Sequence, residues 1–321
     1  NPPNGLGTPA VVDTDGNGAA DRAYAGDLEG HLWVFDLSDD SNSANWGLDY
    51  NANGVPVPLF SARTPKLDAN GTQEKDADGN DVYVRQPITS KPAIALHSSA
   101  LNGTATSQDA PNLMVFFGTG KYLEQSDLQN LSKQSFYGIW DHGDNGLLSA
   151  DLFKQTISSS TPTDSSGNEL RIFDRLSVAF SDEDGWYIDL PANGERVVVN
   201  PDIRGNLVFF NTWIPDSNPC GSGGSGFLMS VEQRDGGAPS APAFNINDAY
   251  DVDEKDFVQV NSISYTPAGQ SYDNGLPAPS SFLSTKQYTP GTGSEIVQSR
   301  EVEKLGGPGT GRISWQQLIA E

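Results

Sequence analysis

The sequence predicts an all-β fold with long loops and little helix. Short apolar runs are separated by clusters of Gly, Pro, Asn, Asp and Ser, which is the pattern of strands that end in turns. The 321 residues include 34 Gly and 21 Pro, so breaks between elements are frequent. Units of strand, turn and strand recur loosely along the chain without an exact repeat. We expect a single domain over residues 1–321.

The first element is a candidate calcium loop at residues 13–21, with the sequence DTDGNGAAD. Oxygen-bearing side chains fall at loop positions 1, 3, 5 and 9, and Gly18 stands at position 6, as in an EF-hand loop. Calcium is a hard cation that takes six to eight oxygen ligands, and position 7 normally supplies a main-chain carbonyl. The candidate ligands are Asp13, Asp15, Asn17, the carbonyl of Ala19, and Asp21.

The loop departs from the EF-hand pattern in two respects. Position 12 is Tyr24, so the bidentate Glu is missing, and the flanking residues indicate strands and not helices. The sequence therefore predicts a calcium loop within β-structure, completed by water or by another segment. The alternative is an Asx-rich turn that binds no metal.

Residues 24–37 read as a strand, a Gly/Asp turn and a second strand. Alternation places Leu32 and Val34 on one face and Trp33 and Phe35 on the other, so we expect this strand to be buried on both faces. The turn at 26–30 is expected to be exposed and close to the calcium loop.

Further along the chain, residues 54–86 are polar and contain a second acidic cluster, Asp76–Asp81, for which a solvated hairpin tip is favoured over a second calcium site. We expect a connection with a short helical turn at 121–133 and long surface loops at 235–300 with one or two short strands, such as 257–263. The other expected strands are 86–96, 112–120, 135–141, 178–180, 186–190, 195–200, 206–214 and 226–231, and apolar residues in 309–318 are expected to anchor the end of the chain.

The net charge of −23 excludes nucleic acid and anionic membrane as partners, because the chain repels both. This acidity suits calcium sites and a secreted protein, and a salty habitat is the alternative explanation for it. No apolar run approaches the roughly 18–20 residues of a membrane-spanning helix. The chain begins at Asn1 without an initiator Met, which indicates a fragment or a processed product.

Several segments together resemble the β-propeller domain of the PilC/PilY family of type IV pilus tip-associated adhesins, and they occur in that family's order. The segment that follows the loop, AGDLEGHLWVFDL, also resembles a blade of a quinoprotein-type propeller. The matching segments are 13–37 (DTDGNGAADRAYAGDLEGHLWVFDL), 115–123 (VFFGTGKYL), 135–141 (SFYGIWD), 206–231 and 311–318 (GRISWQQL).

The resemblance implies a modified, quinoprotein-like β-propeller that is the C-terminal part of a larger propeller and of a longer protein, with a second chain as one possible source of missing blades. It implies calcium ligation by the five loop residues named above. It also implies an extracellular, pilus-associated protein, exported through the outer membrane, that acts in pilus extension and retraction, twitching motility and adhesion. Its partners would be minor pilins and host or abiotic surfaces. No Arg-Gly-Asp sequence is present, so integrin binding is not implied.

Two other functions stay open. One is a propeller dehydrogenase with a quinone cofactor; the absence of a haem motif and of adjacent cysteines argues against it, and we expect no enzymatic activity. The other is a structural domain with a permanent calcium ion. His31, His97 and His142 lie far apart in sequence without ligand spacing, so no zinc site is expected.

Overall fold

The computed structural model describes residues 4–101, 110–173, 183–216, 223–247, 252–283, 286–293 and 297–301. The described part is almost entirely β-structure, as the sequence predicts, with one short helix, α1 (Ser98–Leu101). Four 3-10 segments span Ser43–Asn45, Gln125–Gln129, Ser149–Asp151 and Glu254–Asp256. Within this part, no helix is both long and apolar enough to cross a membrane.

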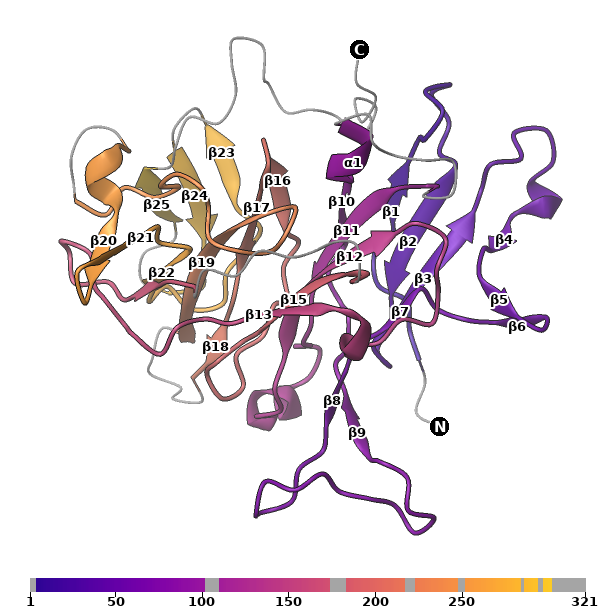
Figure 1. Ribbon diagram of the computed structural model, residues 1–321, viewed down its shortest axis with the longest axis horizontal. Coiled ribbons are helices and arrows are strands. Elements are labelled where there is room, and N and C mark those ends of the chain that lie inside the picture. Colours follow the sequence, from indigo (N-terminus) through magenta and orange to yellow (C-terminus); the bar gives the residue numbers. More distant parts are fainter. Residues whose placement is uncertain are drawn as a thin grey trace.

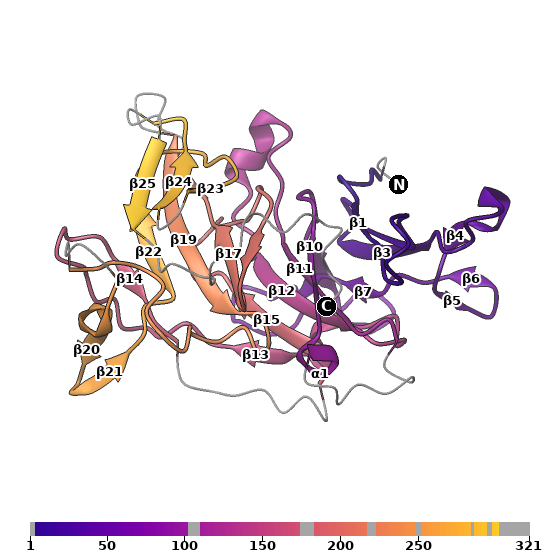
Figure 2. The same ribbon diagram turned by 90° about the horizontal axis from the view of Figure 1, so that it is seen from above.

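Three main sheets follow one another along the chain and lie side by side (Figures 1 and 2). The first contains β1 (Ala10–Val12), β2 (Arg22–Gly26), β3 (His31–Asp36) and β4 (Gly47–Leu48), with β7 (Phe60–Ser61) also paired to β3. The second has the order β10 (Ala93–Leu96), β11 (Leu113–Gly118), β12 (Ser135–Asp141), β15 (Gly185–Asp189) and β13 (Phe153–Gln155). The third has the order β14 (Leu170–Arg171), β22 (Gly269–Tyr272), β19 (Gly224–Glu232), β17 (Leu207–Asn211) and β16 (Asp202–Arg204), with β18 (Ile214–Pro215) paired to β19.

The structure also contains smaller sheets. The pairs are β5 (Asn51–Ala52) with β6 (Val55–Pro56), β8 (Arg63–Pro65) with β9 (Tyr83–Arg85), and β20 (Val258–Val260) with β21 (Ile263–Tyr265). A further sheet contains β23 (Ser281–Leu283), β24 (Lys286–Pro290) and β25 (Val297–Glu301). Strands β8 and β9 form the base of an arm that projects from the body (Figure 1).

The sheets stack face to face through two apolar cores, in the manner of propeller blades. All six residues of β11 are buried, and alternate side chains enter different cores. Val115 and Phe117 join the core shared with the first sheet, whereas Met114 and Phe116 join the core shared with the third. Burial on both faces explains why this segment is a continuous apolar run.

Burial on both faces was also expected for β3, and there the prediction is only half right. Leu32 and Val34 are buried in the core with the second sheet, but Trp33 and Phe35 are half-buried. The first sheet has no described main sheet on its other side, so its outer face has fewer apolar neighbours.

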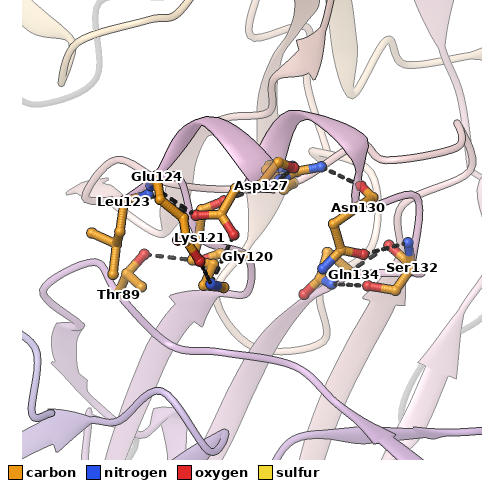
Figure 3. Close-up of polar contacts among 10 residues, drawn as sticks. Thr89, Gly120, Lys121, Leu123, Glu124, Asp127, Asn130, Ser132 and Gln134 are labelled. Carbon is orange, nitrogen blue, oxygen red and sulfur yellow. Dashed lines mark hydrogen bonds and ion pairs between the residues drawn. The ribbon is translucent and has the colours of Figure 1, made fainter. Parts of the chain in front are cut away.

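Segment 115–123, one of the segments that resemble the PilC/PilY family, contains two glycines that allow other parts of the chain to pack closely against it. A Cβ on Gly118 would lie 2.2 Å from Val197, and one on Gly120 would lie 2.4 Å from Arg196, so only glycine permits these contacts. The following 3-10 turn, which was expected, is held by the buried Asp127 carboxylate; this accepts bonds from the main-chain nitrogens of Leu123 and Glu124 (Figure 3). Arg196 donates to the main-chain carbonyls of Lys121, Asp127 and Asn130.

One strand prediction in the C-terminal half is wrong, and another is incomplete. Residues 195–200 contribute only an isolated bridge between Arg196 and Trp213, and β16, in the expected turn after them, pairs with β17 instead. Within 235–300, β20 lies in the expected strand 257–263, but β22, which was not expected, pairs with both β14 and β19 inside the third sheet. The expected strand 178–180 and the expected anchor at 309–318 lie outside the described residues.

Gly138 on β12 is a position where the packing of the second sheet leaves no room for an added methyl group. A Cβ there would lie 2.4 Å and 2.6 Å from two carbons of the buried Trp186 indole. Because Trp186 fills the core between two sheets, it cannot withdraw. Gly138→Ala should lower the free energy of unfolding by roughly 1–3 kcal/mol, the usual cost of overpacking. Urea denaturation measures it, with exposed Gly47→Ala as the control. Equal midpoints for the two variants would show that the core yields at this position.

Candidate metal centre

The loop at residues 13–21 connects two antiparallel strands of the first sheet. Val12, the last residue of β1, pairs with Arg22, the first residue of β2. The main-chain nitrogen of Asp21 donates to the carbonyl of Val12 at 2.9 Å, which closes the base of the loop. The strand pairing therefore brings the first and last candidate ligands, Asp13 and Asp21, together.

Hydrogen bonds within the loop turn its main chain around the acidic side chains. Asp13 accepts from the nitrogens of Gly16 (2.6 Å) and Gly18 (2.8 Å), one on each carboxylate oxygen. Asp15 and Asn17 each accept from the nitrogen two residues later. Gly18 has a φ of 91°, which explains why the sequence has glycine at position 6.

The carboxylates of Asp13, Asp15 and Asp21 converge. Each offers an oxygen, and these three atoms lie within 4.8 Å of one another. Asp13 and Asp21 are buried, at 4% and 5% exposure. Burial raises the pKa of Asp13, but bonds from the nitrogens of Gly18 and Gly16 outweigh it and hold that pKa below its ordinary value, so the group is ionised at neutral pH.

The donor set fits calcium. In the described residues, no Lys or Arg forms an ion pair with any of the three carboxylates, so like charges face one another without a protein counter-charge. The available atoms are carboxylate, amide and main-chain oxygens, with no imidazole or thiol, which is the ligand chemistry of a hard cation. The structure brings together three of the predicted ligands, Asp13, Asp15 and Asp21, whereas ligation by Asn17 and by the carbonyl of Ala19 stays a prediction.

Two residues outside the predicted set bear on the departure from the EF-hand pattern. Tyr24, at position 12, points away from the loop, because it is fully buried and its hydroxyl donates to Asp141 at 2.5 Å. Asp40 comes from the segment after β3 and accepts a bond from the Asn17 side chain at 2.9 Å. Asp40 is therefore an acidic side chain from another segment that contacts the loop through Asn17, and sequence spacing gave no signal for it.

A buried polar cluster connects the loop to the second sheet. Arg22, which follows Asp21, contacts Asp49 at 2.6 Å and Asp141 of β12 at 3.3 Å. Asp141 is fully buried and also accepts the hydroxyls of Tyr24 and Tyr50. Burial, and then the Asp141 carboxylate, raises the pKa of the Tyr24 hydroxyl well above its ordinary value, so it remains a donor.

A cavity of about 490 Å³ opens beside this cluster. Its lining brings Thr14 and Asp21 of the loop together with Arg22, with Asp49, and with Gly143 from the chain after β12. The loop, the buried cluster and the end of β12 thus share one surface of the molecule.

The second acidic cluster has a different geometry. Asp76 begins a turn at the exposed end of the arm and accepts from the nitrogens of Asp78 (2.9 Å) and Asn80 (2.8 Å), while Asp81 pairs with Lys75 at 2.7 Å. The same pattern of bonds occurs in the turns that begin at Asp27 and Asp164. A hairpin turn accounts for this cluster.

The Gly/Asp turn at 26–30 differs from the prediction. It lies at the opposite end of β2 from the loop, and Asp27 and Gly30 are buried. The Asp27 carboxylate accepts the Trp33 indole N–H at 2.8 Å, and a Cβ on Gly30 would lie 2.6 Å from the carbonyl oxygen of Ala62. This turn is therefore packed and is not an exposed surface beside the candidate calcium loop. The candidate calcium loop is connected to the second sheet through Arg22 instead.

Comparison with known proteins gives consistent matches. The model of the PilY1 beta-propeller domain matches residues 1–163. A type IV pilus biogenesis factor PilY1 homolog of Xylella fastidiosa is 35% identical over 247 residues, covering 73% of this chain and 14% of that protein. Type IV pilus biogenesis factor PilY1 of Pseudomonas aeruginosa is 29% identical over 343 residues, covering 98% of this chain and 28% of that protein.

A solved structure matches as well. The crystal structure of the Pseudomonas aeruginosa PilY1 C-terminal domain has a TM-score of 0.68 and 24% identity, covering 95% of this chain and 62% of that one. At this identity the likeness shows a shared fold. The two curated relatives are much longer than this chain, which spans 14% and 28% of their lengths.

Proposed function

The chain belongs to the PilY1 β-propeller family, and from that premise we propose that it is the calcium-binding, non-catalytic domain of a type IV pilus biogenesis factor. The observation that carries the calcium part is the convergence of Asp13, Asp15 and Asp21, two of them buried, without a cationic partner in the described residues. The pilus part rests on relatives that are named as pilus biogenesis factors.

The calcium ion would neutralise the clustered carboxylates and cross-link the two ends of the loop. The side chains of this chain define what the loop can influence. Asp21 precedes Arg22, whose guanidinium contacts Asp141 of the second sheet, so the order of the loop bears on the packing between two blades. A loop with an ordered and a looser state could therefore act as a switch and not only as a structural cross-link.

In the cell, we place this domain outside the outer membrane, on the type IV pilus. There it would act in pilus extension and retraction, twitching motility and surface adhesion, with minor pilins as partners. The relatives support pilus involvement in general, and the acidic charge of −23 suits an extracellular calcium-binding domain.

Two substitutions at one ligand test the switch. Asp21→Ala removes a ligand, whereas Asp21→Lys places an ammonium beside Asp13 and Asp15 and mimics the bound charge balance. With the full-length protein at normal levels in its own bacterium, we expect Ala to shift surface pilation toward extension or retraction, and Lys to shift it the opposite way. Pili are counted by shearing, and twitching zones are measured.

The control is Asp78→Ala, on the exposed tip of the arm, which should behave as wild type. If both Asp21 variants also give wild-type pilation and twitching, the switch is refuted and a bound calcium ion would be purely structural.

A further inference from the structure

We propose that His142, Asp144 and Asp184 form a second metal site, for a divalent transition-metal ion of the zinc type. Their ligand atoms, one from each side chain, lie within 4.8 Å of one another. Nε2 of His142 lies 2.8 Å from Oδ1 of Asp184 and 4.0 Å from Oδ2 of Asp144. Ligands of one tetrahedral zinc ion, each about 2.0–2.2 Å from the metal, lie about 3.3 Å apart, so small side-chain movements suffice.

Strand pairing brings these residues together from distant parts of the sequence. His142 directly follows β12, and Asp184 directly precedes β15, the antiparallel partner of β12. The main chain of Asp184 is fixed on both sides, because its carbonyl accepts from Trp140 at 2.9 Å and its nitrogen donates to Asp151 at 3.0 Å. Gly143, with a φ of 109°, turns the chain between His142 and Asp144.

Aromatic stacking sets the orientation of the imidazole before any metal binds. The His142 ring stacks on Trp140, with 4.0 Å between centroids and 26° between planes. Trp140 is in turn held by a bond from its indole N–H to Asn112 (2.9 Å) and by stacking against His97. A fixed ligand loses little conformational freedom on binding, which favours affinity.

Charge and access also suit a cation. Within the described residues, neither Asp144 nor Asp184 pairs with Lys or Arg, so the imidazole faces two carboxylates. Asp144 is 70% exposed, which leaves a path for an ion and for water ligands. The nitrogen ligand separates this site from the all-oxygen loop at Asp13–Asp21, because imidazole favours zinc, nickel or copper over calcium.

The test is a zinc titration of the domain against a chromophoric chelator. Asp144→Ala, on an exposed side chain, and His142→Ala should each weaken zinc binding at least tenfold, since each removes one of three protein ligands. The matched control is His31→Ala, which removes a histidine that also pairs with an Asp, Asp27 at 3.0 Å, but has no third ligand among the residues that the structure describes. It should bind zinc as wild type does.

Calcium titration of the same variants is the check on folding, and it should be unchanged for Asp144→Ala. The proposal is overturned if wild type binds no zinc in the micromolar range, or if Asp144→Ala and His142→Ala bind it as tightly as His31→Ala does. Either result would leave the cluster as a histidine–carboxylate salt bridge.

Discussion

Replacing Asp141 with alanine is expected to lower the free energy of unfolding by about 3–5 kcal/mol, the usual cost of removing one partner from a buried charge cluster. Asp141 is fully buried on β12, where it accepts from Tyr24 and Tyr50 and faces Arg22. Without it, the buried Tyr24 hydroxyl loses its acceptor, and a buried polar group without a partner costs about 1–3 kcal/mol.

Chemical denaturation followed by tryptophan fluorescence measures this effect. Asp78→Ala, an exposed Asp on the arm, is the control and should change stability by less than about 0.5 kcal/mol. If Asp141→Ala lowers the free energy of unfolding by less than about 1 kcal/mol, the buried polar cluster does not hold the first two sheets together. That result would also contradict the proposed connection between the calcium loop and the second sheet.

The second large effect is expected at the loop itself. Asp13→Ala should weaken calcium binding at least tenfold, because Asp13 is the first ligand and both of its oxygens also organise the loop through Gly16 and Gly18. A fluorescent calcium chelator used as competitor gives the ratio of affinities. The fold should survive, since the cores between the sheets lie outside the loop, and faster amide exchange should be confined to about residues 10–26.

Retention of wild-type affinity in Asp13→Ala would contradict the ligand assignment. Global unfolding of the wild-type domain in EGTA at room temperature would contradict the local character of the effect.

The candidate calcium loop could be predicted from the sequence because its candidate ligands lie within nine residues of one another. A short loop fixes their relative positions through local bonds and two glycines with positive φ, Gly16 and Gly18, and both features can be read from spacing. Asp40, Asp141 and the pair of His142 with Asp184 could not be found in this way. They reach their partners through strand pairing or through the packing of one sheet on another, across 23 to 119 residues, and no spacing rule covers such distances.

A strand could be predicted where its own residues show its burial, and it was missed where only distant partners determine its place. A strand such as β11, buried on both faces, is a continuous apolar run and is recognised at once. Strand β22 is built from Gly269-Gln-Ser-Tyr272, and its place in the third sheet depends on partners far away. A Cβ on its glycine would lie 2.4 Å from the sulfur of Met229, so the Met229 side chain would have to shift, a constraint visible only in the folded chain.

Titration calorimetry of calcium into the wild-type domain and Asp13→Ala tests the central claim most directly. We predict one ion per wild-type chain, with a dissociation constant of roughly 10⁻⁵ to 10⁻³ M because the bidentate Glu of an EF-hand is missing. Magnesium, which requires compact octahedral geometry, should compete poorly. The Asp13→Ala domain should give much smaller heats over the same range of calcium concentration, as expected for binding that is at least tenfold weaker. Equal binding heats from the two proteins would contradict a calcium site at Asp13–Asp21.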